Sequence, residues 1–265
     1  AYGDELFRMT GWRCYSSKNM IDWECHGTIL RPKDFPYCKM EDSAWASQVV
    51  EKNGKFYWYV TLDSPASIGV AVADSPLGPF KAHPKKVVDP DDTPHGKDWG
   101  EDIDPTAFVD DDGTAWLCWG HGDCYIAKLS DDMLSIDGEI RKYDFPYHTE
   151  GPWIYKRNGL YYIFYPSNAE NEIGEQCDYV TAPSMLGPWT YRGRVTGPAM
   201  HSFTIHPGII DFKGKTYFFY HNGLLTLDVK MPDGSVKQLG PATGRRTTCV
   251  EEMFFNEDGS VKPVK

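Results

Sequence analysis

Two carboxylates of this chain stand at equivalent places in a repeated pattern. Asp104 lies nine residues before Gly113, Glu150 lies nine residues before Gly159, and each glycine belongs to a predicted hairpin turn. Equivalent positions of a repeat converge when the repeats are arranged around one axis. Two carboxyl groups that meet at one point can share proton donation and charge stabilisation, which is the chemistry of an acid/base enzyme.

The same register selects two more side chains. Trp45 lies nine residues before Gly54, and His206 lies eight residues before Gly214. An indole ring can stack against a sugar, while carboxyl groups supply the proton transfers of glycoside hydrolysis. The predicted axial set is therefore Trp45, Asp104, Glu150 and His206.

Each carboxylate also has a simpler interpretation as part of a turn. Asp104 stands before a proline, and Glu150 stands before a glycine and a proline. Asp, Gly and Pro gather in turns for conformational reasons, so either carboxylate alone would be weak evidence of a site. The register that the two share is what favours a functional pair.

Four similar hairpins must position these side chains. In each, a glycine in a tight turn is preceded by an apolar run and followed by a run rich in aromatic residues. This is the pattern of two β-strands joined by a turn that needs positive φ. The turn glycines are Gly54, Gly113, Gly159 and Gly214, 46 to 59 residues apart. Such a spacing is typical of propeller blades with four strands each.

A second motif follows the hairpins, where the outer strands of each blade belong. Segments 71–80 and 180–189 are nearly superimposable, and 125–134 occupies the same place in its repeat. Segment 15–23 fits this motif too, although only fourteen residues precede it. We therefore expect an all-β, five-bladed β-propeller that forms one catalytic domain, residues 1–265, with a first blade that is incomplete at its inner strands.

Composition and charge exclude several classes of function. The formal net charge is −11 and the pI is near 5.1, which argues against a nucleic-acid partner because phosphates demand a basic surface. No apolar run reaches eighteen residues, so no membrane-spanning helix is expected. The seven cysteines include no C-x-x-C pair and indicate no zinc site. A neutral substrate suits this chain, and its cellular location stays open.

Several segments together resemble glycoside hydrolase family 43. The similarity covers essentially the whole chain, including the outer-strand motifs. The motifs that carry it are AWA at 44–46, DIDPT at 102–106, TEGPW at 149–153, HPG at 206–208 and RRTTCVE at 245–251. The resemblance implies a five-bladed propeller that hydrolyses arabinofuranosides, xylosides or arabinan with inversion of configuration.

The resemblance also implies a role for each matching residue. Glu150 would be the general acid, and Asp104 the auxiliary carboxylate that raises the pKa of the acid and orients it. Trp45 would line the pocket for the terminal sugar, and Arg246 would reach the same pocket from the last blade. His206 would contribute to substrate binding near the axis, where it would face a water or a hydrated calcium ion. No other cofactor is required.

One catalytic group of the family has no match in the chain. Inversion needs a second carboxylate that activates water, and in the family this base is an aspartate at the start of the first inner strand. The repeat places that position before residue 1, while Asp4 and Glu5 precede no glycine hairpin. We therefore expect the chain to bind arabinosides or xylosides but to turn them over weakly. Hydrolysis of 4-nitrophenyl pentosides at ordinary enzyme rates would contradict this expectation.

Two other functions fit parts of the pattern. A non-catalytic propeller, either a carbohydrate-binding module or a protein-interaction scaffold, would share the blades and aromatic runs, but it would not need two acids and an imidazole at the axis. A fructan-cleaving propeller hydrolase would retain configuration and would use a nucleophilic aspartate in the first blade.

Two segments outside the repeats also carry predictions. The acidic, proline-containing stretch 89–101 is long for a blade connection and is expected to overhang the site. Segment 250–264 has the pattern of another hairpin, which would either complete the last blade or cover the first. His121 and His221 are better explained as loop or strand-end residues than as substrate contacts.

Overall fold

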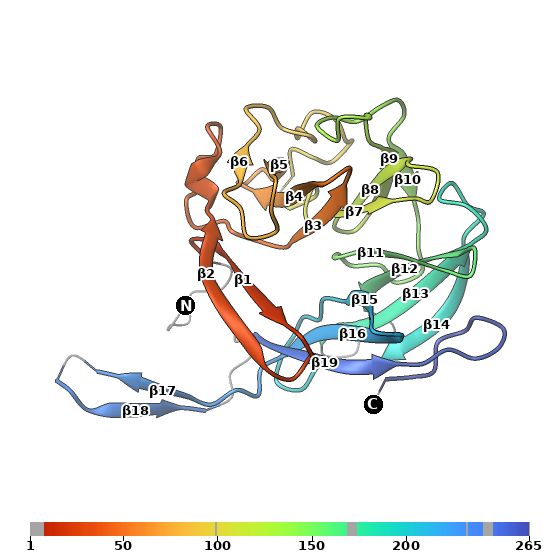
Figure 1. Ribbon diagram of the computed structural model, residues 1–265. Helices are drawn as coiled ribbons and strands as arrows, with labels where there is room; N and C mark the ends of the chain where they lie inside the picture. The colour runs from red at the N-terminus through yellow and green to blue at the C-terminus, as the bar shows by residue number, and fades with distance from the viewer. Residues whose placement is uncertain (1–7, 99, 169–173, 232, 241–245, 265) are drawn as a thin grey trace.

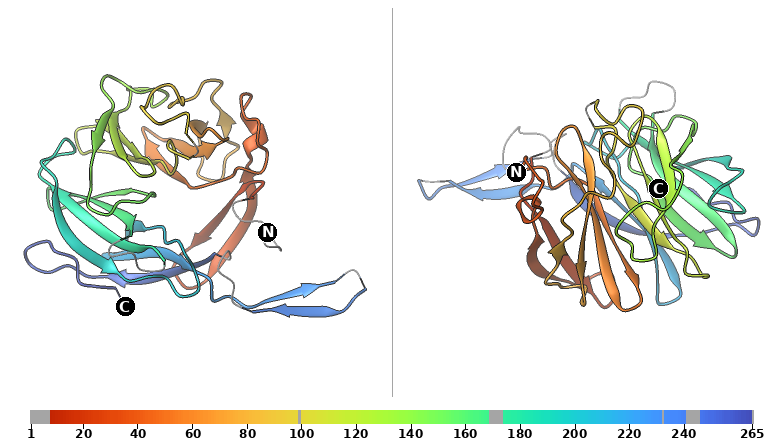
Figure 2. Two further views of the ribbon diagram at one scale, coloured as in Figure 1. Left: turned by 180° about the vertical axis from the view of Figure 1, so that it is seen from behind. Right: turned by 90° about the horizontal axis from the view of Figure 1, so that it is seen from above.

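The fold is built from separate β-sheets arranged around a common axis (Figure 1 and Figure 2). The computed structural model describes residues 8–98, 100–168, 174–231, 233–240 and 246–264. Within these ranges the one helix is the short 3₁₀ helix η1 (Pro32–Asp34), and no helix is long and apolar enough to cross a membrane. The fold is therefore an all-β propeller.

Three blades have four antiparallel strands each. The first comprises β3 (Ser47–Lys52), β4 (Lys55–Leu62), β5 (Ser67–Ala73) and β6 (Lys81–Ala82). The second comprises β7 (Thr106–Val109), β8 (Ala115–Trp119), β9 (Cys124–Lys128) and β10 (Arg141–Tyr143). The third comprises β11 (Trp153–Arg157), β12 (Leu160–Ser167), β13 (Gln176–Ala182) and β14 (Thr190–Thr196).

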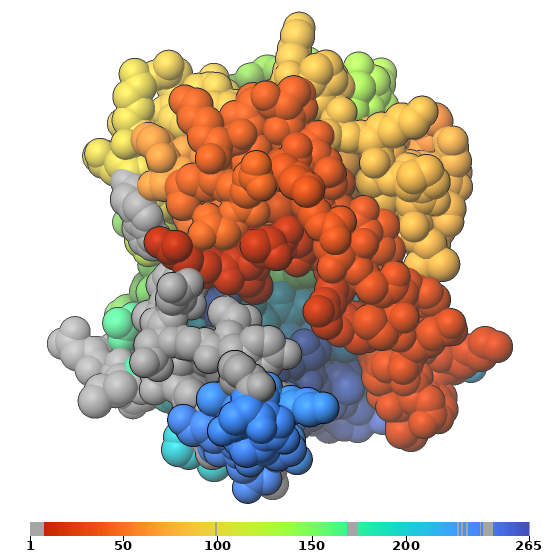
Figure 3. Space-filling model, turned by 90° about the vertical axis from the view of Figure 1, so that its left-hand side faces the viewer, coloured from red at the N-terminus to blue at the C-terminus, as the bar shows by residue number. Residues whose placement is uncertain are grey.

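Three smaller sheets complete the described structure. A fourth blade has three strands, β15 (Gly208–Phe212), β16 (Lys215–Asn222) and β19 (Thr247–Met253). A two-stranded sheet is formed by β1 (Trp12–Ser17) and β2 (Trp23–Leu30), and an arm that projects from the disc is formed by β17 (Leu227–Lys230) and β18 (Val236–Leu239). The surface is hollowed between the N-terminal residues, in red and orange, and the C-terminal part of the chain, in blue (Figure 3).

The hairpins lie where the glycine repeat predicts them. They are β3–β4, β7–β8, β11–β12 and β15–β16. Three of the turns have two consecutive residues with positive φ, which gives a turn whose twist matches that of the strands. These pairs are Asn53 and Gly54, Asn158 and Gly159, and Lys213 and Gly214.

The hairpins also determine which side chains reach the axis. The first strands of the four blades, β3, β7, β11 and β15, are neighbours of one another in that order. Trp45, Asp104 and His206 each lie two residues before such a strand, and Glu150 lies three residues before one. The predicted axial residues therefore all lead into the innermost strands.

The second motif lies at the end of the third strand of a blade and in the turn into its fourth strand. This holds for β5–β6, β9–β10 and β13–β14. Segment 15–23, which shares the motif, covers the turn between β1 and β2. The structure thus describes four blades and, beside them, a two-stranded sheet.

The hydrophobic core lies between neighbouring blades. Tyr59 of β4 and Trp119 of β8 are fully buried in one cluster that joins the first and second blades. Ile163 of β12 belongs to the cluster between the second and third blades. Phe164 and Phe218 belong to the cluster between the third and fourth blades. Neighbouring blades thus stabilise one another, because a single sheet cannot bury its own apolar face.

The C-terminal segment completes the last blade. Of the two alternatives for 250–264, the structure supports this one, because β19 pairs with β16 along its length. The residues beyond β19 then turn at Gly259 and lie against the third blade. Tyr162 Oη donates to the carbonyl of Gly259 at 2.7 Å, and the amide of Val264 donates to the carbonyl of Val195 at 2.8 Å.

Removing a ring from the core between the third and fourth blades should be costly. Phe164 is fully buried and stacks on Tyr179, with ring centroids 5.5 Å apart. We expect Phe164→Ala to lower the free energy of unfolding by about 3–5 kcal/mol, as measured by urea denaturation. Phe254→Ala is the matched control, because 54% of that side chain is exposed, and it should change stability by about 0.5 kcal/mol or less. Equal losses from the two variants would contradict this account of the core.

Candidate active site

A cavity of about 240 Å³ lies where the inner strands begin. Its walls come from segments far apart in the sequence, and they combine apolar surfaces with a few ionisable groups, as is usual for ligand pockets. The ionisable groups are Asp104, His121, Glu150, Glu175, His206 and Arg246, and the apolar walls include Met9, Trp45, Ile103 and Phe203. The cavity therefore brings together every site residue that the sequence predicts.

Asp104 is held in an unusual backbone conformation. Its φ is 61°, in the left-handed region that non-glycine residues rarely adopt. Its amide donates to Thr61 Oγ1 of β4 at 2.8 Å, and its carboxylate is 6% exposed. Strain of this kind costs on the order of 1–3 kcal/mol and is concentrated at functional sites. The surrounding blades thus fix the direction in which this carboxylate points.

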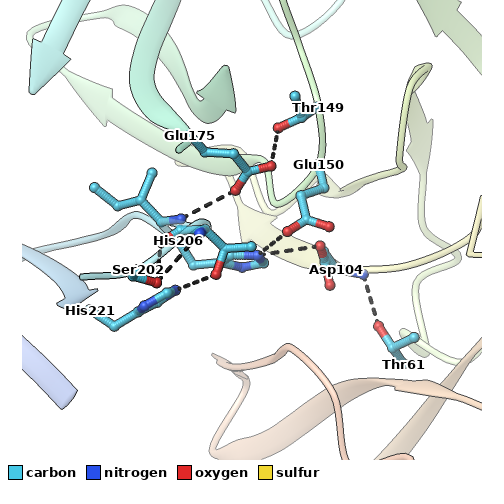
Figure 4. Close-up of polar contacts among 10 residues, drawn as sticks. Thr61, Asp104, Thr149, Glu150, Glu175, Ser202, His206 and His221 are labelled. Carbon is cyan, nitrogen blue, oxygen red and sulfur yellow. Dashed lines mark hydrogen bonds and ion pairs between the residues drawn. The ribbon is translucent and has the colours of Figure 1, made fainter. Parts of the chain in front are cut away.

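His206 joins the two predicted carboxylates. Its Nε2 lies 3.0 Å from Glu150 Oε1, within hydrogen-bond distance, and 3.7 Å from Asp104 Oδ2 (Figure 4). The approach needs a glycine at position 151, since a Cβ there would lie 2.9 Å from two atoms of the His206 ring. Gly151, the glycine of the TEGPW motif, therefore leaves room for the imidazole to pack beside the segment that carries Glu150.

The three groups shift one another's pKa. For His206, burial opposes the proton, but the charge of Asp104 and the hydrogen bond with Glu150 outweigh it and raise the pKa to about 9. For Asp104, burial raises the pKa to about 7, although the charge of the nearby imidazole acts to lower it. For Glu150, burial acts upward, but the hydrogen bond and charge of His206 prevail and lower the pKa to about 2. This arrangement therefore places a proton on His206 and a negative charge on Glu150.

The lowered pKa of Glu150 differs from the effect that the sequence predicts for Asp104. The prediction was that the charge of Asp104 raises the pKa of Glu150, whereas in this arrangement His206 has the larger effect and lowers it. The reason is the direct contact between His206 and Glu150, which a repeat register cannot reveal. The proton of this pair lies next to Glu150, on the imidazole.

Glu175 is a carboxylate of the cavity that sequence reasoning missed. It directly precedes β13, the third strand of its blade, so it lies outside the register of the inner strands. Thr149 Oγ1 donates to its Oε1 at 2.7 Å, and the amide of Ile205 donates to its Oε2 at 3.2 Å. Burial and the charge of Glu150 raise its pKa to about 7. The only sequence signal is its acidity beside a predicted outer strand, which is common on protein surfaces.

The other predicted residues occupy the edges of the cavity. Trp45 is half-buried, and its carbonyl accepts a hydrogen bond from Trp12 Nε1 at 2.6 Å. Arg246 is exposed and lies close enough to lower the pKa of Asp104 by its charge. His121 lies in the loop between β8 and β9, as expected, and also lines the cavity. His221 is buried instead, with its ring 6.1 Å from that of His206.

The long connection before β7 reaches the cavity through Gly100. Its anchor is Asp102, a fully buried carboxylate. Thr93 Oγ1 donates to Asp102 at 2.9 Å, and Trp119 Nε1 donates to it at 2.8 Å. Burial is the main reason why the pKa of Asp102 is raised to about 6. The stretch 89–101 is thus tied to the second blade beside the site.

The cluster suits a calcium ion poorly. Ligand atoms of Asp104, Glu150 and His206 lie within 4.8 Å of one another. Calcium takes six to eight oxygen ligands, whereas this group offers two carboxylates and an imidazole nitrogen that is already paired with one of them. We therefore derive no step through the calcium ion that the resemblance implies for His206.

A propeller whose axial cavity holds paired carboxylates and an imidazole has the features of a glycosidase. The family model of glycosyl hydrolases family 43 matches residues 2–261. The chain belongs to this family.

Three similar proteins extend this finding. A beta-D-galactofuranosidase of Aspergillus niger is 27% identical over 99% of the chain and 77% of its own length. An arabinoxylan arabinofuranohydrolase of Paenibacillus polymyxa is 30% identical over 94% of the chain, but the chain spans only 43% of that relative. A β-xylosidase/α-arabinofuranosidase from a compost microbial metagenome, solved with xylotriose, has a TM-score of 0.78 and 26% identity over 97% of the chain and 84% of its own. All three are named as glycosidases.

The raised pKa of His206 predicts how stability depends on pH. The folded pKa of about 9 exceeds the ordinary 6.5, so the protonated imidazole stabilises the fold fully below about pH 6.5, and this contribution is lost as the pH rises through about 9. We expect the stability difference between the parent and His206→Gln, measured by thermal unfolding, to shrink over this range. Phe254→Ala, an exposed control without an ionisable side chain, should show no such trend. The measurement should extend from about pH 6 to about pH 9.5, beyond both pKa values. A stability difference between parent and variant that stays constant over this range would refute the prediction.

Proposed function

We propose that the chain is an inverting glycosidase that removes arabinofuranosyl or xylosyl units from hemicellulose-type polysaccharides or oligosaccharides. The observation that supports this most strongly is the contact of His206 with Glu150 and Asp104 in the axial cavity. Glu150 is the proposed general acid and Asp104 the auxiliary carboxylate. Trp45 and Arg246 are proposed to bind the sugar, together with His206.

The proposed proton transfer uses the pair of Glu150 and His206. A leaving oxygen must receive a proton as its bond to the sugar breaks, and such donation contributes about 10²–10⁴ in rate. His206 holds a proton at neutral pH, 3.0 Å from Glu150 Oε1. As the bond to the sugar breaks, the glycosidic oxygen accepts the proton of this pair through Glu150, and His206 is left neutral. Asp104, buried and adjacent, favours the protonated form of its neighbours.

The substrate class follows from the family and its relatives. The relatives are named for arabinofuranosyl, xylosyl or galactofuranosyl groups, all of them neutral sugars. A neutral sugar fits a chain with a net charge of −11 and a cavity with an indole wall. None of these names favours a non-catalytic carbohydrate-binding module.

We also propose that the chain is a single catalytic domain and that the ring has five blades. In this proposal β1 and β2 are the outer pair of the fifth blade, because the turn between them carries the motif that joins the third and fourth strands elsewhere. Trp12 and Leu30 of this pair pack in one cluster with Trp58 of β4, as expected for adjacent blades.

Removing the proposed acid should abolish hydrolysis and leave binding intact. We expect Glu150→Ala to lower kcat on an arabinoxylan oligosaccharide by about 10²–10⁴. Binding of arabinose or xylose, measured by calorimetry, should persist. Glu252→Ala is the control, because that carboxylate pairs with Lys215 at 2.6 Å outside the cavity. The same assay measures the turnover of the parent, which is expected to be weak. A kcat of Glu150→Ala equal to that of the parent would rule out the proposed acid.

The stereochemistry of the product provides an independent test. Inversion requires that the sugar first appears with the anomeric configuration opposite to that of the substrate. Proton NMR of an early time point distinguishes the two anomers before they equilibrate. A product with retained configuration would favour a mechanism with a covalent intermediate instead, as in the fructan-cleaving alternative.

A further inference from the structure

Glu175 occupies a special place among the carboxylates of the cavity. It comes from the start of β13, an outer strand, yet it lies beside residues that lead into two inner strands. Its amide donates to the carbonyl of Phe203 at 3.0 Å, which fixes the backbone at this point. The side chain thus spans the boundary between the third and fourth blades.

The two oxygens of Glu175 hold two different segments. Oε1 accepts from Thr149, the residue directly before Glu150, and Oε2 accepts from the amide of Ile205, the residue directly before His206 (Figure 4). One carboxylate therefore links the backbone positions from which the proposed acid and its imidazole partner extend. The two hydrogen bonds constrain both segments, and they are stronger while Glu175 is ionised, because a charged acceptor strengthens a hydrogen bond.

We propose that Glu175 is a positioning residue that sets the approach of His206 to Glu150. This inference rests on the proposed function of Glu150 as the proton donor. Misplacement of a catalytic group by about 1 Å costs on the order of 10²-fold in rate, which is the scale of effect that such a link can control.

The contacts of Glu175 indicate the support of other groups. Each of its oxygens accepts one hydrogen bond from the protein, at 2.7 and 3.2 Å, and these two bonds fix the orientation of the carboxyl group. The residues that donate them stand directly before Glu150 and His206, so a change at Glu175 should act through those two side chains.

The kinetic test compares two leaving groups. The 2,4-dinitrophenolate group of a 2,4-dinitrophenyl pentoside leaves without much help from an acid. Cleavage of xylobiose or of an arabinoxylan oligosaccharide requires protonation of the leaving oxygen. If Glu175 positions the donor, Glu175→Gln should lower kcat by about 10–100-fold on the oligosaccharide and by about threefold or less on the activated substrate. A purely structural role would lower both rates by the same factor, and that result would overturn the proposal.

Two further variants sharpen the comparison. Thr149→Val removes only the hydroxyl that donates to Glu175, so its effect and that of Glu175→Gln should be less than additive in the double variant. Asp178→Asn is the matched control. Asp178 lies three residues further along β13, is fully buried and accepts from Tyr191 Oη at 2.8 Å, away from the cavity. It should cost stability without changing the ratio of the two rates.

A measurement without turnover separates this proposal from the proposed function. The ring ¹⁵N resonances of His206 report its contact with Glu150, so they should shift in Glu175→Gln and in Thr149→Val but not in Asp178→Asn. Unchanged resonances in the first two variants would overturn the positioning role even in an active enzyme. If the resonances shift in these two variants but the parent hydrolyses no glycoside, the link is supported and the glycosidase proposal is refuted.

Discussion

The contact between His206 and Glu150 is the interaction on which the site depends. It joins the segments that lead into two adjacent inner strands, and it neutralises a carboxylate that would otherwise be costly to bury. Asp104 Oδ2 lies 3.7 Å from the same imidazole nitrogen, and its residue has a strained backbone conformation that the neighbouring blade maintains. The three groups therefore form one charge system, in which burial and the contacts with His206 together determine the protonation state of each carboxyl group.

Much of this arrangement could be predicted from the sequence, because a repeat carries three-dimensional information. The glycine turns determine the hairpins, the hairpins determine the inner strands, and Asp104 and His206 occupy equivalent places before two of those strands. Glu175 could not be found in this way, since it precedes a third strand and reaches the cavity only through the packing of adjacent blades. The lowered pKa of Glu150 was out of reach for the same reason: it depends on a 3.0 Å contact between side chains.

The propeller also explains why the site can combine rigid placement with varied specificity. The ionisable groups precede strands whose positions are fixed by clusters between blades, such as the one that contains Phe164 and Phe218. The walls, in contrast, come from connections between strands, including Gly100, Phe203 and Arg246. Such connections vary readily among relatives while the scaffold is kept, which agrees with the different sugars in the names of similar enzymes.

The residues after β19 affect how the third and fourth blades unfold. β19 belongs to the fourth blade, but the residues after it are hydrogen bonded to the third, through Tyr162, Tyr179 and Val195. Neither blade can separate from the disc without breaking these bonds, so the two should unfold as one cooperative unit and share similar protection against hydrogen exchange. Glu150 and His206 come from these two blades. The C-terminal strap thus makes the partial loss of one half of the acid–imidazole pair a rare event.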